Sequence, residues 1–330
     1  MGKAMYLASA LLMEPPTSIT LPKTLIILVT YNGAKWLPEV LDALGVSDAY
    51  DVWARDNGSQ DDTLDILQKH PAASVVSAGD NVGFGVANNE GMQYALDQGY
   101  DSVFLLNQDC RIDAQAMLEL RKKGLRHQGH VSCPVQMNWD REGANLGFDT
   151  RYAPGWQTAS EPFNVNFVNA AAWFIPIDVV RVVGGFNPAF FMYGEDRDWA
   201  RRLLKTGGSF AVLPSIRCFH QSSAQGQHLT MRTVNERIAF SFEVTAYFME
   251  ADSHDAWRRG WLGRAFGRSF HRKQLFNTLT MVNPLAEWRA RKRIQSAREE
   301  WEVLREGANR ATPFLGNPTP RDEPCDSFAG

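Results

Sequence analysis

Four apolar, strand-like runs alternate with helix-like stretches between residues 24 and 109, and this alternation restricts the folds open to the chain. The first run, "TLIILVTYN" at 24–32, is rich in β-branched residues and has no polar break, which is typical of a strand buried on both faces. Similar runs occupy 50–59, 73–81 and 101–109, with helix-like spacing at 34–45, 60–70 and 86–99. The pattern predicts an α/β fold with an open, mostly parallel sheet and helices on both faces.

After about residue 130 the alternation fails. Residues 131–172 mix polar and aromatic residues, so we expect irregular sheet and loops there. Regular patterns return in "AAWFIPIDVVRVVGG", "GEDRDWARRLLKTGG" and "SFAVLPSIRCFH", of which the last is typical of a strand. We divide the chain into a disordered leader, a main α/β domain, a basic helical extension and a flexible tail, at 1–22, 23–250, 251–311 and 312–330.

Composition excludes several classes of protein. The net charge of the 330 residues is −3, which gives no global attraction to nucleic acid. The four cysteines lie far apart without a CxxC pair, so we expect no zinc site and a reducing, cytoplasmic environment. The apolar run from Tyr6 to Met13 is too short to span a bilayer and is followed at once by two prolines, which favours a leader over a secretion signal.

Residues 254–310 differ in charge from the rest of the chain. They hold thirteen basic and six acidic residues, a net charge of +7. Aromatic residues are interleaved with these bases: Trp257, Trp261, Phe266, Phe270, Trp288 and Trp301. Such a segment suits peripheral contact with an anionic membrane surface, at the inner face of the cytoplasmic membrane. The alternative is a pair of helices packed on the main domain with a solvated basic face, and the sequence leaves both open.

Polar side chains stand where the predicted strands end. They are Thr30, Tyr31 and Asn32; Asp56 and Asn57; Asn81 and Gly83; and Asn107, Gln108 and Asp109. Because the carboxyl ends of parallel strands share one edge of the sheet, we expect a ligand site there. The pattern GxGxxG is missing after the first strand, which disfavours a nicotinamide dinucleotide.

Taken singly, these residues have simpler structural explanations. The run Asp56-Asn57-Gly58 fits a turn, and Asp109 fits the N-cap of the helix that follows it. His220, just after a predicted strand, is more often structural than a ligand when it stands alone. The convergence of these residues on one edge is the stronger argument.

A second acidic group lies in "FFMYGEDRDWARRL" at 190–203. Glu195, Asp196 and Asp198 fall in the first turn of a predicted helix, where carboxylates complement the helix dipole. The aromatic residues before them favour a second interpretation, because a carboxylate beside apolar surface gains basicity and suits a general base.

Assembled in order, these motifs resemble the family 2 glycosyltransferases, particularly bacterial rhamnosyltransferase-like members. The resemblance runs from about Leu25 to His220 and rests on "VTYNGAKWLPEVLDAL", "RDNGSQDDT", "NVGFGVANNEG", "LLNQDC", "VGGFNPAFFMYGEDRDWARRL" and "CFH". It implies a GT-A fold, a nucleotide-sugar donor, Mg²⁺ or Mn²⁺, and inversion at the anomeric carbon. It further implies a glycan or lipid-linked glycan acceptor in bacterial surface polysaccharide synthesis, with dTDP-rhamnose as the leading donor and UDP-sugars as alternatives.

The resemblance also assigns roles to positions. Thr30, Tyr31 and Asp56 match nucleotide contacts, with Asp56 facing the base, and Asn32, Asn57, Asn107 and Gln108 stand beside these motifs. Asn81, Gly83 and Asn89 match the segment lining the donor pocket. Asp109 matches the metal-binding acid, with Asn107 where a second acid would be usual and His220 as its partner. Asp196 matches the catalytic base, with Glu195 beside it.

Some positions depart from the family pattern. Arg55 stands where the family often has an apolar residue or a second acid, and Cys110 and Asn187 replace a common Thr and Asp. These departures leave the choice of donor open. The rival interpretations are a non-catalytic protein that binds nucleotide-sugars, a dehydrogenase and a nucleotidyltransferase. The last two would need a glycine-rich phosphate loop after the first strand, and the chain lacks one.

Overall fold

A computed structural model of the protein describes residues 22–71, 73–127, 129–140, 142–145, 147–192, 194–221 and 284–308, with isolated positions at 239–240, 243–244, 247, 257–258 and 314–315. The predicted leader therefore lies almost entirely outside the described residues, as does most of the tail.

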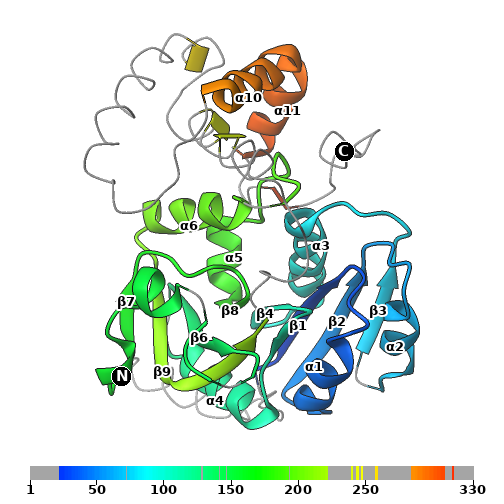
Figure 1. Ribbon diagram of the computed structural model, residues 1–330, viewed down its shortest axis with the longest axis vertical. Coiled ribbons are helices and arrows are strands. Elements are labelled where there is room, and N and C mark those ends of the chain that lie inside the picture. The colour runs from blue at the N-terminus through cyan, green and yellow to red at the C-terminus, as the bar shows by residue number, and fades with distance from the viewer. Residues whose placement is uncertain are drawn as a thin grey trace, which may run out of the picture.

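The described strands form one sheet, which Figure 1 shows as the centre of the molecule. Their order is β3-β2-β1-β4-β8-β6-β9-β5, and β7 pairs with β9. Their bounds are β1 Thr24–Thr30, β2 Tyr50–Asp56, β3 Ala73–Ser77, β4 Ser102–Asn107, β5 Cys110–Arg111, β6 His130–Asn138, β7 Phe163–Val165, β8 Ala172–Pro176 and β9 Ser209–His220. The strands from β3 to β4 are all parallel, as the sequence predicts.

Helices cover both faces of this sheet. They are α1 Leu37–Leu44, α2 Thr63–Lys69, α3 Phe84–Asp97, α4 Ala114–Gly124, α5 Ile177–Val183 and α6 Glu195–Lys205. Alternate residues of β1 enter two different cores, in keeping with the two-residue period of a strand. Ile26 and Leu28 pack with residues of α1, α2 and α4, whereas Leu25 and Ile27 pack with residues of α3, α5 and α6. The predicted two-sided α/β architecture is confirmed.

Residues 131–172, where we expect irregular sheet and loops, begin with a strand longer than the sequence suggests. The nine-residue strand β6 lies inside the sheet, antiparallel to β8 and parallel to β9, with a shift of register between Pro134 and Val135. Its sequence, "HVSCPVQMN", hides this position because it carries polar residues that the sheet buries. Ser132 and Gln136 are 0% and 1% exposed. Apart from the three-residue strand β7, the described residues from 139 to 171 are irregular, with a π-helical turn at Phe148–Tyr152 and a 3₁₀ turn at Trp156–Thr158.

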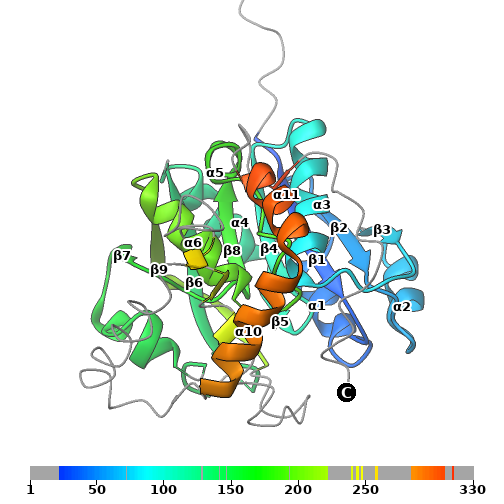
Figure 2. The ribbon, with the colours of Figure 1, turned by 90° about the horizontal axis from the view of Figure 1, so that it is seen from above.

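The basic extension contributes two described helices, α10 Pro284–Ser296 and α11 Arg298–Ala308. Figures 1 and 2 show both on the side of the molecule that carries α3, α5 and α6. Trp257 and Trp301 are 2% and 3% exposed and share a core cluster with Phe190, so they pack on the main domain. Trp288 is 55% exposed. Trp261, Phe266 and Phe270 lie outside the described residues.

Candidate active site

The predicted strand-end residues meet at one edge of the sheet. The register places Thr30 of β1 opposite Asp56 of β2, and Val29 of β1 opposite Asn107 of β4. The polar groups that follow these strands are therefore neighbours, although they come from separate parts of the sequence. This edge is where parallel α/β sheets bind ligands.

The turn after β1 is held by side chains from the neighbouring strand ends. The backbone N–H of Tyr31 donates to Oε1 of Gln108 at 2.9 Å, and Nε2 of Gln108 donates to the carbonyl of Tyr31 at 3.0 Å. A Cβ on Gly33 would lie 2.2 Å from Oε1 of Gln108, so a larger residue there would displace the Gln108 amide. Oδ1 of Asn32 accepts from the backbone of Gln60 at 2.8 Å, and the ring of Tyr31 is 40% exposed at the mouth of this turn.

Asp56 shapes the turn after β2. The residue is 1% exposed, and its carboxylate accepts from the hydroxyl of Thr30 at 3.1 Å and from the backbone N–H of Ser59 at 3.0 Å. The hydroxyl of Ser59 donates to the same carboxylate at 2.5 Å. The turn that the sequence suggests is therefore present, and contact between Asp56 and a base stays a prediction.

The loop before α3 joins this edge to the segment that precedes α6. Asn57 donates to Oδ1 of Asn81 at 3.1 Å, and the same oxygen accepts from the backbone of Gly83 at 3.0 Å. Gly83 has φ +84°, and a Cβ there would lie 2.2 Å from the carbonyl oxygen of Phe191. The N–H of Phe84 donates to that carbonyl at 3.1 Å. The loop and residues 190–192 are thus in direct contact.

The side-chain amide of Asn89 is held by backbone groups. Its side-chain amide donates to the carbonyl of Phe186 at 2.8 Å and accepts from the N–H of the same residue at 2.6 Å. Both ends of the amide therefore bind backbone, and the residue is 8% exposed. Contact between Asn89 and a donor stays a prediction.

Asp109 lies beside His220. The antiparallel pair β5–β9 sets Cys110 opposite His220, and Nε2 of His220 lies 3.5 Å from Oδ1 of Asp109. The helix that follows is capped by another acid, since Asp113 accepts from the N–H of Ala116 at 2.8 Å. The N-cap interpretation of Asp109 is therefore wrong, and its carboxylate is available for another role.

The residues around this pair fit a divalent cation. A carboxylate oxygen and an imidazole nitrogen are both metal donors, and Mg²⁺ is typically held by one or two carboxylates, substrate phosphates and water. Two buried atoms nearby, Oδ1 of Asn107 and Nδ1 of His220, have no hydrogen-bond partner in the described structure. Among the described residues no group of three His, Cys, Asp or Glu side chains gathers as a closed metal cage. One carboxylate and one imidazole supply two of the donors that such an ion would need.

Asp196 has the properties of a general base. Burial raises the pKa of its carboxyl above the ordinary value of 3.8, against the lowering effects of Arg197 and of hydrogen bonds from the backbone of Arg197 and Ala170. The N–H of Arg197 donates to Oδ1 of Asp196 at 2.7 Å. The negative charge of Asp196 in turn adds to burial in raising the pKa of Tyr152. A carboxylate in this environment binds a proton more readily than one in water.

The acids beside Asp196 have other surroundings. Asp198 is 0% exposed and accepts from Nε of Arg202 at 3.0 Å. Arg202 also donates to the backbone carbonyls of Val183 and Gly185, and burial lowers the pKa of its guanidinium. The bonds of Arg202 to these two carbonyls tie α6 to the end of α5. Asp198 is a structural acid, and Glu195 is 6% exposed in the same turn.

Aromatic packing fixes the helix that bears Asp196. The rings of Trp173 and Trp199 lie 5.3 Å apart between centroids, and Trp173 and Phe210 lie 5.0 Å apart. The indole N–H of Trp199 donates to the carbonyl of Gly184 at 2.8 Å. Because such pairs have specific geometry, they hold α6 in one position relative to the sheet.

The segment Asn169–Ala171 connects the two acidic parts of the site, and sequence reasoning missed it. The N–H of Asn107 donates to the carbonyl of Ala171 at 3.0 Å, and the backbone of Ala170 bonds to Asp196. These bonds come from backbone groups of alanines, whose side chains give no sign of them. Tyr152 was missed too, because it stands in an irregular stretch without a motif.

Comparison with known proteins gives the family that the site-bearing part of the chain resembles. Residues 25–180 match the family described as glycosyl transferase family 2. This part of the chain is similar to a family 2 glycosyltransferase domain. The matched part includes every predicted donor-side residue and Asp109, whereas Asp196 and His220 lie beyond it.

The chain is also similar to two bacterial rhamnosyltransferases. The chain is 26% identical over 270 residues to the N-acetylglucosaminyl-diphospho-decaprenol L-rhamnosyltransferase of Mycobacterium tuberculosis strain H37Rv, covering 71% of this chain and 86% of that protein. It is 23% identical over 200 residues to the dTDP-rhamnosyl transferase RfbF of Shigella flexneri, covering 59% of this chain and 67% of that protein.

The fold of the chain also has a counterpart among solved structures. The mannosyltransferase PcManGT of Pyrobaculum calidifontis, solved in complex with GDP-Man and Mn²⁺, superposes with a TM-score of 0.52 at 17% identity. The superposition covers 89% of this chain and 82% of that one. The predicted GT-A fold is confirmed.

Proposed function

We propose that the protein is an inverting glycosyltransferase that moves a sugar from a nucleotide-sugar donor to a hydroxyl group of a glycan or lipid-linked glycan. The observation that carries this proposal is the placement of Asp196. Its carboxyl has a raised pKa and is held by the backbone of Ala170, next to the carbonyl of Ala171 that binds the end of β4. These contacts support Asp196 as the base of the proposed reaction.

The proposed reaction is a single displacement. Asp196 accepts the proton of the acceptor hydroxyl while that oxygen forms a bond to the anomeric carbon. The bond from this carbon to the phosphate oxygen breaks, and its electron pair leaves with the nucleoside diphosphate. Attack from the face opposite the leaving group inverts the configuration, and a positioned base of this kind typically contributes about 10²–10⁴-fold to the rate.

The leaving diphosphate needs its negative charge balanced. Asp109 and His220 are the residues that would hold Mg²⁺ or Mn²⁺, and such an ion when bound neutralises charge on the departing phosphates. The open Asp109–His220 pair leaves coordination positions for phosphate oxygens and water.

The names of the relatives support a choice of donor and acceptor. Rhamnose from dTDP-rhamnose is our leading donor, since both relatives are described as rhamnosyltransferases and one as using dTDP-rhamnose. A lipid-linked acceptor agrees with the exposed Trp288, which has the ammonium of Lys292 5.2 Å from its ring centroid and suits an anionic membrane surface. No helix among the described residues is long and apolar enough to cross a membrane.

A thermal-shift panel tests the proposal. The purified chain is heated with dTDP-rhamnose, UDP-glucose or GDP-mannose, each with and without Mn²⁺. Ligand at about 100 times its Kd stabilises a protein by about 2.7 kcal/mol, so a donor that binds raises the melting temperature measurably. We expect the largest shift with dTDP-rhamnose and Mn²⁺. No shift with any of the three donors would overturn the proposal.

Binding alone does not separate a transferase from a non-catalytic nucleotide-sugar-binding protein. The second measurement is therefore release of dTDP from dTDP-rhamnose in the presence of a polyprenyl-diphosphate-linked N-acetylglucosamine acceptor. A shift without turnover by the wild-type protein would favour the non-catalytic alternative.

A further inference from the structure

Arg55 is a charged residue buried in the sheet. It lies in β2 directly before Asp56 and is 1% exposed. Buried charged side chains are costly unless they are paired and hydrogen-bonded, so every bond of this guanidinium is informative. The sequence analysis noted Arg55 as a departure from the family pattern, and the proposed reaction does not use it.

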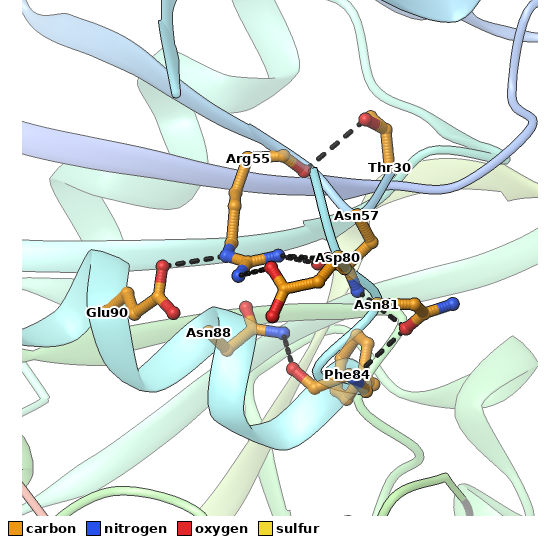
Figure 3. A network of polar contacts seen from close by, with 9 residues as sticks. Thr30, Arg55, Asn57, Asp80, Asn81, Phe84, Asn88 and Glu90 are labelled. Atoms are coloured by element: carbon orange, nitrogen blue, oxygen red, sulfur yellow. Dashed lines mark hydrogen bonds and ion pairs between the residues drawn. The ribbon is translucent and has the colours of Figure 1, made fainter. Parts of the chain in front are cut away.

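Figure 3 shows the guanidinium of Arg55 between α3 and the loop that precedes it. Nε donates to Glu90 at 2.7 Å, and NH2 lies 3.6 Å from a carboxylate oxygen of Asp80. NH1 donates to the carbonyl of Asp80 at 3.3 Å and to Oδ1 of Asn57. The carboxylates of Glu90 and Asp80 thus balance the charge of Arg55, and NH1 also donates to the side-chain amide of Asn57.

The hydrogen bond from Arg55 to Asn57 fixes the orientation of the Asn57 side-chain amide. A guanidinium can only donate, so Asn57 must turn its oxygen toward Arg55 and its NH₂ group away. That NH₂ group donates to Oδ1 of Asn81 at 3.1 Å. The backbone N–H of Gly83, which also can only donate, binds the same oxygen at 3.0 Å.

The consequence is a fixed orientation of Asn81. Both partners of its oxygen are donors, so its NH₂ group must face the other way. Figure 3 shows Nδ2 of Asn81 pointing away from the network. Among the described residues no hydrogen-bond partner of this NH₂ group is present. Asn81 is partly exposed at the ligand-binding edge, so its NH₂ group is available to an oxygen atom of a ligand.

We propose that Arg55 is a positioning residue that, through Asn57, turns the amide NH₂ of Asn81 toward an acceptor oxygen of the nucleotide-sugar donor. The inference rests on the proposed function for the identity of the ligand and on the geometry alone for the relay Arg55–Asn57–Asn81. The acceptor oxygen belongs to the base or to the diphosphate, and both would receive the same hydrogen bond.

Two variants break the relay in different ways. Arg55→Met removes the guanidinium and keeps the length of the side chain. Asn57→Asp keeps an oxygen for Arg55 but places a second oxygen against Oδ1 of Asn81, which favours rotation of the Asn81 amide. Glu90→Gln is the matched control, because it removes one ion pair of Arg55, retains an acceptor for Nε and leaves Asn57 and Asn81 unchanged.

The first readout needs no ligand. Exchange of the Gly83 backbone amide with deuterium reports whether Oδ1 of Asn81 still accepts from it. We expect faster exchange in Arg55→Met and Asn57→Asp than in Glu90→Gln and the wild type. Equal exchange in all four proteins would overturn the relay, whether or not any nucleotide-sugar binds.

The second readout is the Kd for dTDP-rhamnose, dTDP and thymidine, together with kcat and KM. One hydrogen bond corresponds to about a tenfold change in Kd, so we expect about a tenfold weaker donor and a smaller change in kcat for both relay variants. Weaker binding of all three probes would show that Asn81 donates to an oxygen of the base. Weaker binding of only dTDP-rhamnose and dTDP would show that it donates to the diphosphate. Relay variants that melt lower but bind as Glu90→Gln does would show a structural role only and overturn the proposal. A wild type that binds no probe would instead defeat the proposed function.

Discussion

Nε2 of His220 lies 3.5 Å from a carboxylate oxygen of Asp109 because the short strand β5 pairs with the end of β9. The pairing is antiparallel and sets Cys110 opposite His220, so the residue before Cys110 and the last residue of β9 share one end of the pair. The carbonyl of Asp109 also accepts from the N–H of Gln221 at 2.9 Å. Backbone geometry thereby holds the two residues that we propose as metal donors.

Removing either donor should weaken metal binding. Loss of a supporting residue in a metal site typically costs about 10–100-fold in affinity, and Asp109→Asn or His220→Ala should cost at least as much. The measurement is the apparent Kd for Mn²⁺ in the presence of dTDP, followed by electron paramagnetic resonance. His130→Ala is the control, because His130 stands at the opposite end of the pair β6–β9 and binds Ser209. Unchanged Mn²⁺ affinity in both site variants would contradict the assignment.

The raised pKa of Asp196 predicts an unusual effect on stability. The folded-state pKa lies above the ordinary value of 3.8 because burial disfavours the charged form. The stability contributed by the protonated acid is therefore fully present below that value and lost as the pH rises through the folded-state pKa. Asp196→Asn, which stays neutral, should be more stable than the wild type near pH 7, and the gain should shrink toward about pH 4.

Urea unfolding of both proteins across this range measures the effect. The same pKa predicts that transfer by the wild type falls as the pH drops through a value above 3.8, since the base must be ionised to accept a proton. An Asp196→Asn variant less stable than the wild type at neutral pH would show that the carboxylate is a structural partner.

Gly83 should be the most sensitive glycine of the donor-side loop. Gly83 and Gly207 both have φ +84°, but their surroundings differ. A Cβ added to Gly83 would lie 2.2 Å from the backbone carbonyl oxygen of Phe191. Gly207 has nothing within 4 Å. We expect Gly207→Ala to cost about 1–2 kcal/mol in the free energy of unfolding, from its left-handed backbone alone. Gly83→Ala should cost more and should also weaken binding of dTDP-rhamnose.

Chemical unfolding and calorimetric binding of the two alanine variants give the comparison. Equal losses of stability and unchanged donor affinity in Gly83→Ala would mean that the contact with Phe191 does not hold the loop.

The ion pair of Asp198 and Arg202 should contribute to stability, whereas Asp196 alone should accept the proton. Breaking a buried ion pair by removing one partner costs about 3–5 kcal/mol, because the other charge stays buried. We expect Arg202→Met to lower the free energy of unfolding by this order, as measured in urea. Turnover per folded molecule should fall far less than in Asp196→Asn. A loss of turnover as large as that of Asp196→Asn, in a protein that is folded at the assay temperature, would make Asp198 a rival base.

The sequence predicts the parallel half of the fold well because each buried strand there is a run of apolar residues. The bounds of β9 agree with the predicted strand, Ser209–His220. The strand β6 was missed because Ser132 and Gln136 are buried in it, which breaks the apolar run. Pattern alone cannot separate a buried polar residue from a solvated one.

The site was predictable where side chains carry the chemistry. Asp109, His220 and Asp196 could be proposed from motifs, although only the pairing of β5 with β9 brings the first two together. The backbone contacts of Ala170 and Ala171 leave no trace in the sequence, because every residue has an N–H and a carbonyl. The direction of the relay from Arg55 likewise depends on which atom faces which, and that follows from the fold.

Transfer of rhamnose by the wild type and by Asp196→Asn decides whether the chain is the enzyme proposed. The two proteins are incubated with radiolabelled dTDP-rhamnose, Mn²⁺ and a polyprenyl-diphosphate-linked N-acetylglucosamine, and labelled lipid is counted. We expect transfer by the wild type, a loss of about 10²–10⁴-fold in Asp196→Asn, and equal dTDP-rhamnose affinity in both. Labelled product formed equally fast by the two proteins would contradict the assignment of the base, and no product with either would contradict the proposed reaction.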